Sequence, residues 1–200
     1  MFKESITPQE IEKLDYASFP GKIYVIDSVG AEFNRAVAYL RAQKVIGFDT
    51  ETRPTFTPGQ PHYGVALLQL SGPDRAYLFR VKTMGMHRRL CNLMASEKIL
   101  KVGAAIHDDI RGLQRIRPFD PAGFVDLQKI VCEWGIRDKS VKKMAAIIMG
   151  ARVSKTQQLS NWEVESLSES QQMYAATDAW VCREMYLKLM ASPKNPLQEE

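Results

Sequence analysis

The stretch VIGFDTE, residues 45–51, decides the fold and the chemistry that this sequence predicts. Its apolar start is typical of a central strand, and two acids, Asp49 and Glu51, end it. Because side chains alternate between the two faces of a strand, these acids share one face, opposite to Phe48. An unpaired carboxylate in apolar surroundings costs several kcal/mol, so the pair indicates a bound cation, with a solvated edge strand as the alternative.

Two later segments carry further acids at helical spacing, KVGAAIHDD at residues 101–109 and YAATD at residues 174–178. On a helix that starts near residue 106, Asp109 falls on the apolar stripe, whereas Asp108 falls on the solvated side near the positive helix N-terminus. Tyr174 and Asp178 stand four residues apart, so both project from one helix face. A structural role is the alternative for that pair. Together the three segments predict a metal-dependent phosphoryl-transfer site.

The rest of the chain alternates between strand and helix patterns. Strands are expected over residues 23–28, 45–51, 64–70, 76–81 and 100–105, and helices over 30–40, 88–96, 106–116, 125–134, 141–149 and 169–190. The third and fourth strands should form a hairpin, and a turn-rich stretch with Pro58 and Pro61 precedes them. Ser140 is a candidate N-cap, and Ser168 with Gln171 fits a capping box. This order predicts a single α/β domain with a mixed central sheet flanked by helices.

Composition limits the classes of protein that remain. With 200 residues, 45% of them hydrophobic and 25% charged, one globular domain with a full core is expected. No apolar run reaches the length of a signal peptide or a membrane span, which predicts a cytoplasmic protein without a membrane partner. The three cysteines, Cys91, Cys132 and Cys182, form no CxxC pair and are expected to be buried, reduced thiols. The net charge of +4 is compatible with a polyanionic partner but does not establish one.

Three motifs in this order resemble those of the DEDDy branch of the DnaQ-like 3′-5′ exonucleases. They are GFDTE at residues 47–51, KVG at 101–103 with Asp109, and YAATDA at 174–179. Tyr174 stands where the sister branch has histidine. With SNW at 160–162 and VALLQL at 65–70, the resemblance is greater to the exonuclease domain of the Werner-syndrome protein than to RNase D. It implies a ribonuclease H-like fold over residues 22–190, with an N-terminal extension at 1–21 and a C-terminal tail at 191–200.

The resemblance also implies an activity and its residues. Asp49, Glu51, Asp109 and Asp178 would hold two Mg²⁺ or Mn²⁺ ions, with Asp49 shared between them, and Tyr174 would orient the attacking water. The substrate would be nucleic acid with a free 3′ end, with DNA favoured, and nucleoside monophosphates would be released. An RNA exonuclease of the RNase D type and a non-catalytic binding domain of the same fold are the alternatives.

Three further residues are candidates for substrate binding. Lys155 and Arg152 precede the third motif, where a cation can offset the charge of a phosphate, and a solvated basic surface is the alternative. Trp162 can stack on a terminal base, and its alternative role is to anchor the following loop in the core.

Overall fold

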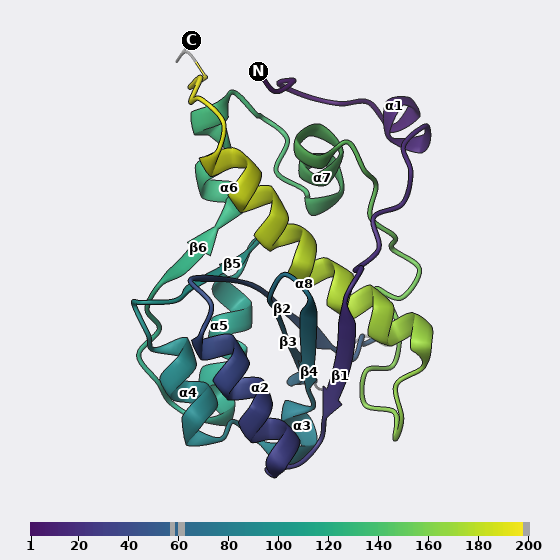
Figure 1. The fold of residues 1–200 in the computed structure, drawn as a ribbon. Coiled ribbons are helices and arrows are strands. Elements are labelled where there is room, and N and C mark those ends of the chain that lie inside the picture. Colours follow the sequence, from purple (N-terminus) through teal and green to yellow (C-terminus); the bar gives the residue numbers. More distant parts are fainter. Residues whose placement is uncertain (57–58, 60–62, 198–200) are drawn as a thin grey trace.

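A six-stranded sheet places the acid-bearing strand near its centre (Figure 1). The computed structural model describes residues 1–56, 59 and 63–197. The strands are β1 (Lys22–Ile26), β2 (Val45–Thr52), β3 (Val65–Ser71), β4 (Arg75–Phe79), β5 (Leu100–Gly103) and β6 (Phe124–Asp126), in the spatial order β1-β4-β3-β2-β5-β6. β3 pairs antiparallel with β2 and β4, and the other pairs are parallel. The mixed sheet and the β3–β4 hairpin are therefore confirmed.

Helices cover both faces of this sheet. They are α1 (Pro8–Glu12), α2 (Ala31–Arg41), α3 (Val81–Met84), α4 (Arg88–Met94), α5 (His107–Ile116), α6 (Leu127–Ile130), the 3₁₀ helix η1 (Val131–Trp134), α7 (Val141–Met149) and α8 (Glu169–Met190). The expected N-cap at Ser140 and the capping box of Ser168 with Gln171 are both present. Each cap satisfies backbone N–H groups that the first helical turn leaves without a partner, which fixes where α7 and α8 begin.

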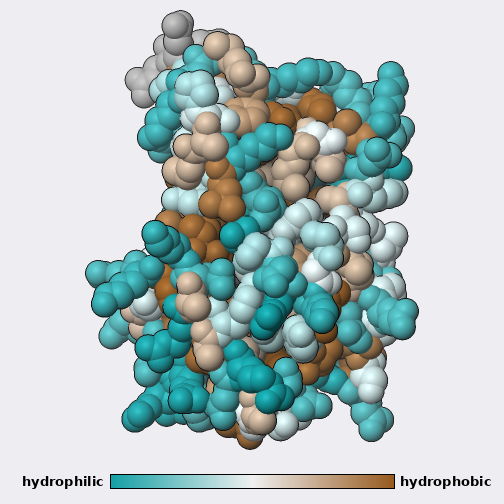
Figure 2. Space-filling model, in the orientation of Figure 1, coloured by the Kyte–Doolittle hydropathy of each residue, from teal (hydrophilic) through white to brown (hydrophobic). Residues whose placement is uncertain are grey.

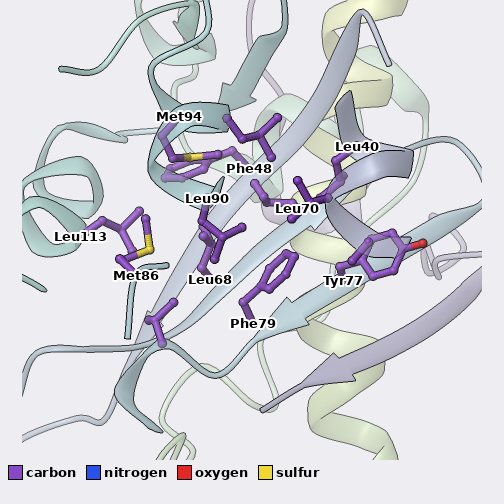
Figure 3. Packing of buried hydrophobic residues seen from close by; sticks show 14 of the residues in the cluster. Leu40, Phe48, Leu68, Leu70, Tyr77, Phe79, Met86, Leu90, Met94 and Leu113 are labelled. Atoms are coloured by element: carbon purple, nitrogen blue, oxygen red, sulfur yellow. The ribbon is translucent and has the colours of Figure 1, made fainter. Parts of the chain in front are cut away.

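The largest core lies on the face of the sheet that Phe48 shares with α2, α4 and α5. Side chains from β2, β3 and β4 meet those of the helices there, and Figure 3 shows Phe48, Leu68, Leu70 and Phe79 among them. The opposite face packs against α8, through Leu67 and Leu78 near Trp162 and Ala175. The alternation of Phe48 with Asp49 along β2 thus puts the apolar side chain in the core and the acid beneath α8.

Close approach between β2 and α8 depends on Gly47. A Cβ atom built on Gly47 would lie 1.8 Å from the carbonyl oxygen of Ala179. No side chain fits in that space, so only glycine lets α8 lie directly on the backbone of β2. This contact brings Asp178, the residue before Ala179, over the acid-bearing end of the strand.

We expect Gly47→Ala to destabilise the protein by about 2 kcal/mol, because α8 must move away from β2 to admit the methyl group. Urea unfolding followed by circular dichroism measures the change. Gly64→Ala is the matched control, since a Cβ atom at Gly64 meets nothing within 4 Å. Equal stability of the two variants would contradict this role of Gly47.

One predicted helix is wrong. The segment 125–134 was expected to be helical, but Phe124–Asp126 form β6, which pairs parallel with β5, and only the residues after it turn into α6 and η1. A three-residue strand is too short to show an alternating pattern, and its pairing with β5 is a long-range contact. α1 and α3 were not predicted. The turn-rich stretch around Pro58 and Pro61 lies outside the described residues.

Among the residues that the structure describes, no helix is both long and apolar enough to cross a bilayer. Hydrophilic residues cover most of the face seen in Figure 2, with hydrophobic residues in smaller groups between them. Cys91 and Cys182 are buried free thiols, as expected, whereas Cys132 is partly exposed.

Candidate active site

Three carboxylates from two elements meet beneath the N-terminal half of α8. One oxygen atom of each of Asp49, Glu51 and Asp178 lies within 4.8 Å of the other two, and all three side chains are half-buried. Asp49 and Glu51 reach this point because they share a face of β2, as their spacing predicted. Asp178 reaches it because α8 lies on Gly47. The arrangement concentrates negative charge in one place.

The three acids line a surface hollow of about 380 Å³. Its walls come from β2, from the segment after β5, from α6, from the start of α7, from the segment between α7 and α8, and from α8 itself. Besides the acids, its polar lining consists of Thr50, Gln128, Ser140, Lys142, Ser154, Lys155, Gln158 and Tyr174. The acids are therefore accessible to a ligand from solvent.

Burial and mutual repulsion both favour the protonated forms of these acids. Burial, followed by the charges of Asp178 and Asp109, raises the pKa of Asp49 well above its usual range. The same causes, with Asp49 added, raise the pKa of Glu51 to about 10. Burial raises the pKa of Asp178 to about 7, although a hydrogen bond from Tyr174 and the charge of Lys155 oppose that rise. The protein alone leaves this charge uncompensated, so the site favours a cation.

Tyr174 stands one turn before Asp178 on α8 and faces the same hollow. Its hydroxyl group donates a hydrogen bond to the carboxylate of Asp178. Burial and the neighbouring carboxylates raise the pKa of the phenol above its ordinary value. Tyr174 therefore stays protonated at neutral pH and acts as a hydrogen-bond donor.

Asp109 approaches β2 from the other face of the sheet. It lies on α5, whose Leu113 belongs to the core beside Phe48, and its carboxylate accepts a hydrogen bond from the hydroxyl group of Thr50. Asp109 is thus outside the group of three acids, but it is near enough for its charge to raise the pKa values of Asp49 and Glu51. Asp108 is exposed. The helix register that separated Asp109 from Asp108 agrees with these positions.

This register gives a prediction for the two neighbouring acids of α5. We expect Asp109→Ala to lower the hydrolysis of nucleic acid by about 100-fold or more, because it removes a carboxylate that the resemblance makes a cation ligand together with Asp49 and Glu51. Asp108→Ala should keep almost the full activity, because its side chain is in solvent. Degradation of a 5′-labelled oligonucleotide in Mn²⁺ measures both variants. The reverse order would show that Asp109 does not belong to the site.

The three candidate substrate-binding residues have different surroundings. Lys155 lines the hollow, and its charge lowers the pKa of Asp178. Arg152 does not line this hollow; its guanidinium group covers the ring of Tyr16 instead. Trp162 is 1% exposed and packs near Tyr174, with 6.0 Å between the ring centroids. This burial fits the role of a core anchor rather than base stacking.

Two residues of the site were not among the candidates chosen from the sequence. Thr50 lies inside the first motif, but its role depends on the rotamer of Asp109, which no spacing reveals. Lys142 enters the hollow from the start of α7, a helix with no acid or motif of its own.

The fold and the site together define a class: an α/β domain that clusters carboxylates at a mixed sheet, as metal-dependent phosphodiesterases do. The chain belongs to the 3′-5′ exonuclease family, whose model matches residues 24–192. The family assignment made from the three motifs is confirmed.

Curated relatives agree with this family. The chain is 30% identical over 192 residues to the mouse bifunctional 3′-5′ exonuclease/ATP-dependent helicase WRN, covering 89% of this chain and 13% of that protein. It is 28% identical over 158 residues to ribonuclease D of Bartonella henselae, covering 77% of this chain and 38% of that protein. The chain thus spans well under half the length of these relatives.

Solved structures show the same fold. The EXO domain of Aedes aegypti Nibbler superposes with a TM-score of 0.74 at 24% identity, covering 88% of this chain and 91% of that one. Escherichia coli RNase D superposes with a TM-score of 0.75 at 22% identity, covering 85% of this chain and 44% of that one. The expected fold class is therefore confirmed.

Proposed function

We propose that this chain hydrolyses nucleic acid from the 3′ end and releases nucleoside monophosphates. The observation that carries the proposal is the meeting of Asp49, Glu51 and Asp178 within 4.8 Å, in a hollow that also holds Lys155. Carboxylates grouped this closely suit a divalent cation, and a nearby lysine suits a phosphate group. Membership of the 3′-5′ exonuclease family supports the direction of cleavage.

The residues of the site fit two divalent cations, Mg²⁺ or Mn²⁺. All the candidate ligand atoms are carboxylate oxygens, which these hard cations prefer, and their raised pKa values mark an uncompensated charge. We propose Asp49, Glu51, Asp109 and Asp178 as the ligands, with Asp49 shared. Asp109 would exchange its hydrogen bond with Thr50 for this role. When bound, such a pair of cations makes a water more acidic and stabilises the leaving oxygen.

The other residues of the hollow have separate tasks. Tyr174 remains protonated, so we assign to its hydroxyl group the orientation of the attacking water beside Asp178 rather than proton removal. Lys155 lines the same hollow and offsets the charge of the scissile phosphate. Neither role requires a nucleophilic side chain, because water is the nucleophile in this proposal.

We propose DNA as the preferred substrate, on the similarity to the mouse exonuclease/helicase. RNA is the second candidate, because a neighbour of the same fold is described as an exoribonuclease involved in structured RNA processing. Catalytic contacts to phosphates carry no information on the sugar, which a protein distinguishes through the 2′ position.

A direct comparison tests these proposals. DNA and RNA oligonucleotides of one sequence, labelled at the 5′ end, are incubated with the protein in Mn²⁺, with and without a chelator. We expect stepwise shortening, mononucleotide products and faster loss of DNA. Faster loss of RNA would reverse the substrate preference. Tight binding of both oligonucleotides without shortening would identify a non-catalytic binding domain.

The division of the chain also remains a proposal. We propose residues 22–190 as the exonuclease domain, which the family match over 24–192 supports, with 1–21 and 191–200 as its flanking segments. The cytoplasmic location stays a prediction from the sequence.

A further inference from the structure

A second hollow, of about 310 Å³, adjoins the one that holds the acids. Lys142, Val153, Ser154 and Lys155 line both hollows. The far side of the second hollow comes from the N-terminal segment, through Ile11, Glu12 and Tyr16. A ligand that leaves the acid cluster along this shared wall therefore meets residues that precede β1 and the family match.

The N-terminal segment is fixed to this wall through its backbone. The N–H group of Ala17 donates to the carbonyl oxygen of Arg152 at 2.8 Å, and the N–H group of Arg152 donates to that of Asp15 at 2.9 Å. These bonds form an isolated bridge between Tyr16 and Arg152. Figure 1 shows the N-terminal chain running between α1 and β1 alongside the segment that follows α7.

Tyr16 presents an aromatic ring at this hollow. The guanidinium carbon of Arg152 lies 3.9 Å from the ring centroid, so a cation covers one face of the ring. The residue is nevertheless 60% exposed, although its backbone is fixed by hydrogen bonds. A ring that is supported on one side and exposed on the other is a suitable stacking surface for a base.

Positive charge surrounds this ring. Arg152, Lys142 and Lys155 line the hollow against a single acid, Glu12. In the described part of the chain, none of the three cations takes part in a salt bridge. The Nε atom of Arg152 is also buried without a hydrogen-bond partner. Cations that are free of salt bridges, beside an exposed ring, match the phosphates and bases of a single strand.

The second hollow suits a nucleic-acid strand better than a third hollow beside the acid cluster. The third hollow shares Tyr174 and Asp178 with it, but its remaining lining is Ala17, Ser154, Thr156, Ser170, Met173 and Thr177. That lining contains no cation, whereas a strand carries one phosphate for every nucleotide. If the terminal nucleotide occupies the hollow of the acids, the strand leaves past Lys155 toward Arg152 and Tyr16.

We propose that Tyr16 and Arg152 form a binding subsite for the part of the nucleic-acid strand on the 5′ side of the scissile phosphate. Tyr16 stacks on a base, and Arg152 supports the ring and attracts the phosphates. This inference rests on the proposed exonuclease function. It makes the N-terminal segment a part of substrate binding rather than an extension outside the site.

Two substrates separate this subsite from the acid cluster. A labelled single-stranded oligonucleotide occupies both, whereas the p-nitrophenyl ester of thymidine monophosphate occupies only the hollow of the acids. We expect Tyr16→Ala to weaken oligonucleotide binding about 5-fold or more, measured by fluorescence anisotropy in the Asp178→Ala background. Hydrolysis of the ester by Tyr16→Ala alone should equal that of the wild-type protein. Tyr16→Phe should bind like the wild type, because it keeps the ring.

Arginine variants provide the matched control. Arg152→Ala should weaken oligonucleotide binding and lower the slope of its salt dependence by about one charge. Arg75→Ala removes an arginine that covers Tyr39 in a similar way, with 4.9 Å to the ring centroid, but lines none of the three hollows. It should leave both measurements unchanged. Melting temperatures confirm that each variant is folded.

The outcomes distinguish this inference from the proposed function. A wild-type protein that hydrolyses neither the oligonucleotide nor the ester would refute the exonuclease and this subsite with it. A wild-type protein that hydrolyses both, together with unchanged oligonucleotide binding in Tyr16→Ala, would refute the subsite alone. Equal losses on the ester and the oligonucleotide would assign Tyr16 a purely structural role.

Discussion

Asp178→Ala should lower the rate of oligonucleotide hydrolysis by about 10³-fold or more while the protein stays folded. Asp178 is the one acid that α8 contributes to the group formed with Asp49 and Glu51, so its loss removes one of the proposed cation ligands. Asp49→Ala should have an effect of the same size, because Asp49 belongs to the same group of acids and is the ligand that we propose both cations share. Single-turnover degradation of a 5′-labelled strand in excess Mn²⁺ measures these rates.

The same two substitutions should not lower the stability of the metal-free protein. The acids repel one another in the metal-free protein, so the loss of one carboxylate relieves repulsion, and the melting temperature should stay equal or rise. Glu184→Ala is the matched control on α8, because Glu184 pairs with Arg183 and does not line the hollow. It should keep full activity. Retained hydrolysis by Asp178→Ala in excess Mn²⁺ would contradict the site assignment.

The parts of the site that depend on local periodicity could be predicted from the sequence. The alternation along β2 put Asp49 and Glu51 on one face, and the spacing of four put Tyr174 and Asp178 on one side of α8. Capping residues fixed the start of α8 in the same way. Each of these predictions needs only neighbours within one or two turns, which is the range over which sequence pattern determines geometry.

The parts that depend on long-range contacts could not be predicted. β6 is a strand because β5 lies beside it, and the hydrogen bond of Asp109 with Thr50 depends on how α5 packs on the sheet. No sequence pattern distinguishes Tyr16 from its neighbours in the N-terminal segment. Its contact with Arg152 is visible only in the folded chain. Gly47 is an intermediate case: its place in the motif was visible, but its contact with Ala179 was not.

A divalent cation should raise the melting temperature of this protein. Binding to the folded state alone contributes about 2.7 kcal/mol at a concentration of 100 times Kd, which corresponds to roughly 5 to 10 °C for a chain of this size. The physical reason is the uncompensated charge of Asp49, Glu51 and Asp178. A titration with Mn²⁺ or Mg²⁺, followed by differential scanning fluorimetry, measures the rise, and a chelator should reverse it.

Protons should compete with the cations for these carboxylates and so reduce the rise in melting temperature. The pKa of Glu51 is raised to about 10 and that of Asp178 to about 7, so the folded protein binds more protons than the unfolded chain at neutral pH. Stability of the metal-free protein should therefore fall as pH rises from the ordinary carboxyl range through these values. Cations must displace the same protons, so the rise in melting temperature should be larger at pH 8 than at pH 6.

Asp49→Asn isolates the role of the proposed shared ligand. The amide keeps the shape of the side chain but removes its charge, so repulsion with Glu51 and Asp178 falls and the metal-free protein should melt at a higher temperature. The same change removes a ligand charge, so the rise caused by Mn²⁺ should shrink. Asp108→Asn, at an exposed position, should keep the wild-type response. An Asp49→Asn protein with the full Mn²⁺ response would show that the cation binds elsewhere, because a site without Asp49 cannot keep its affinity.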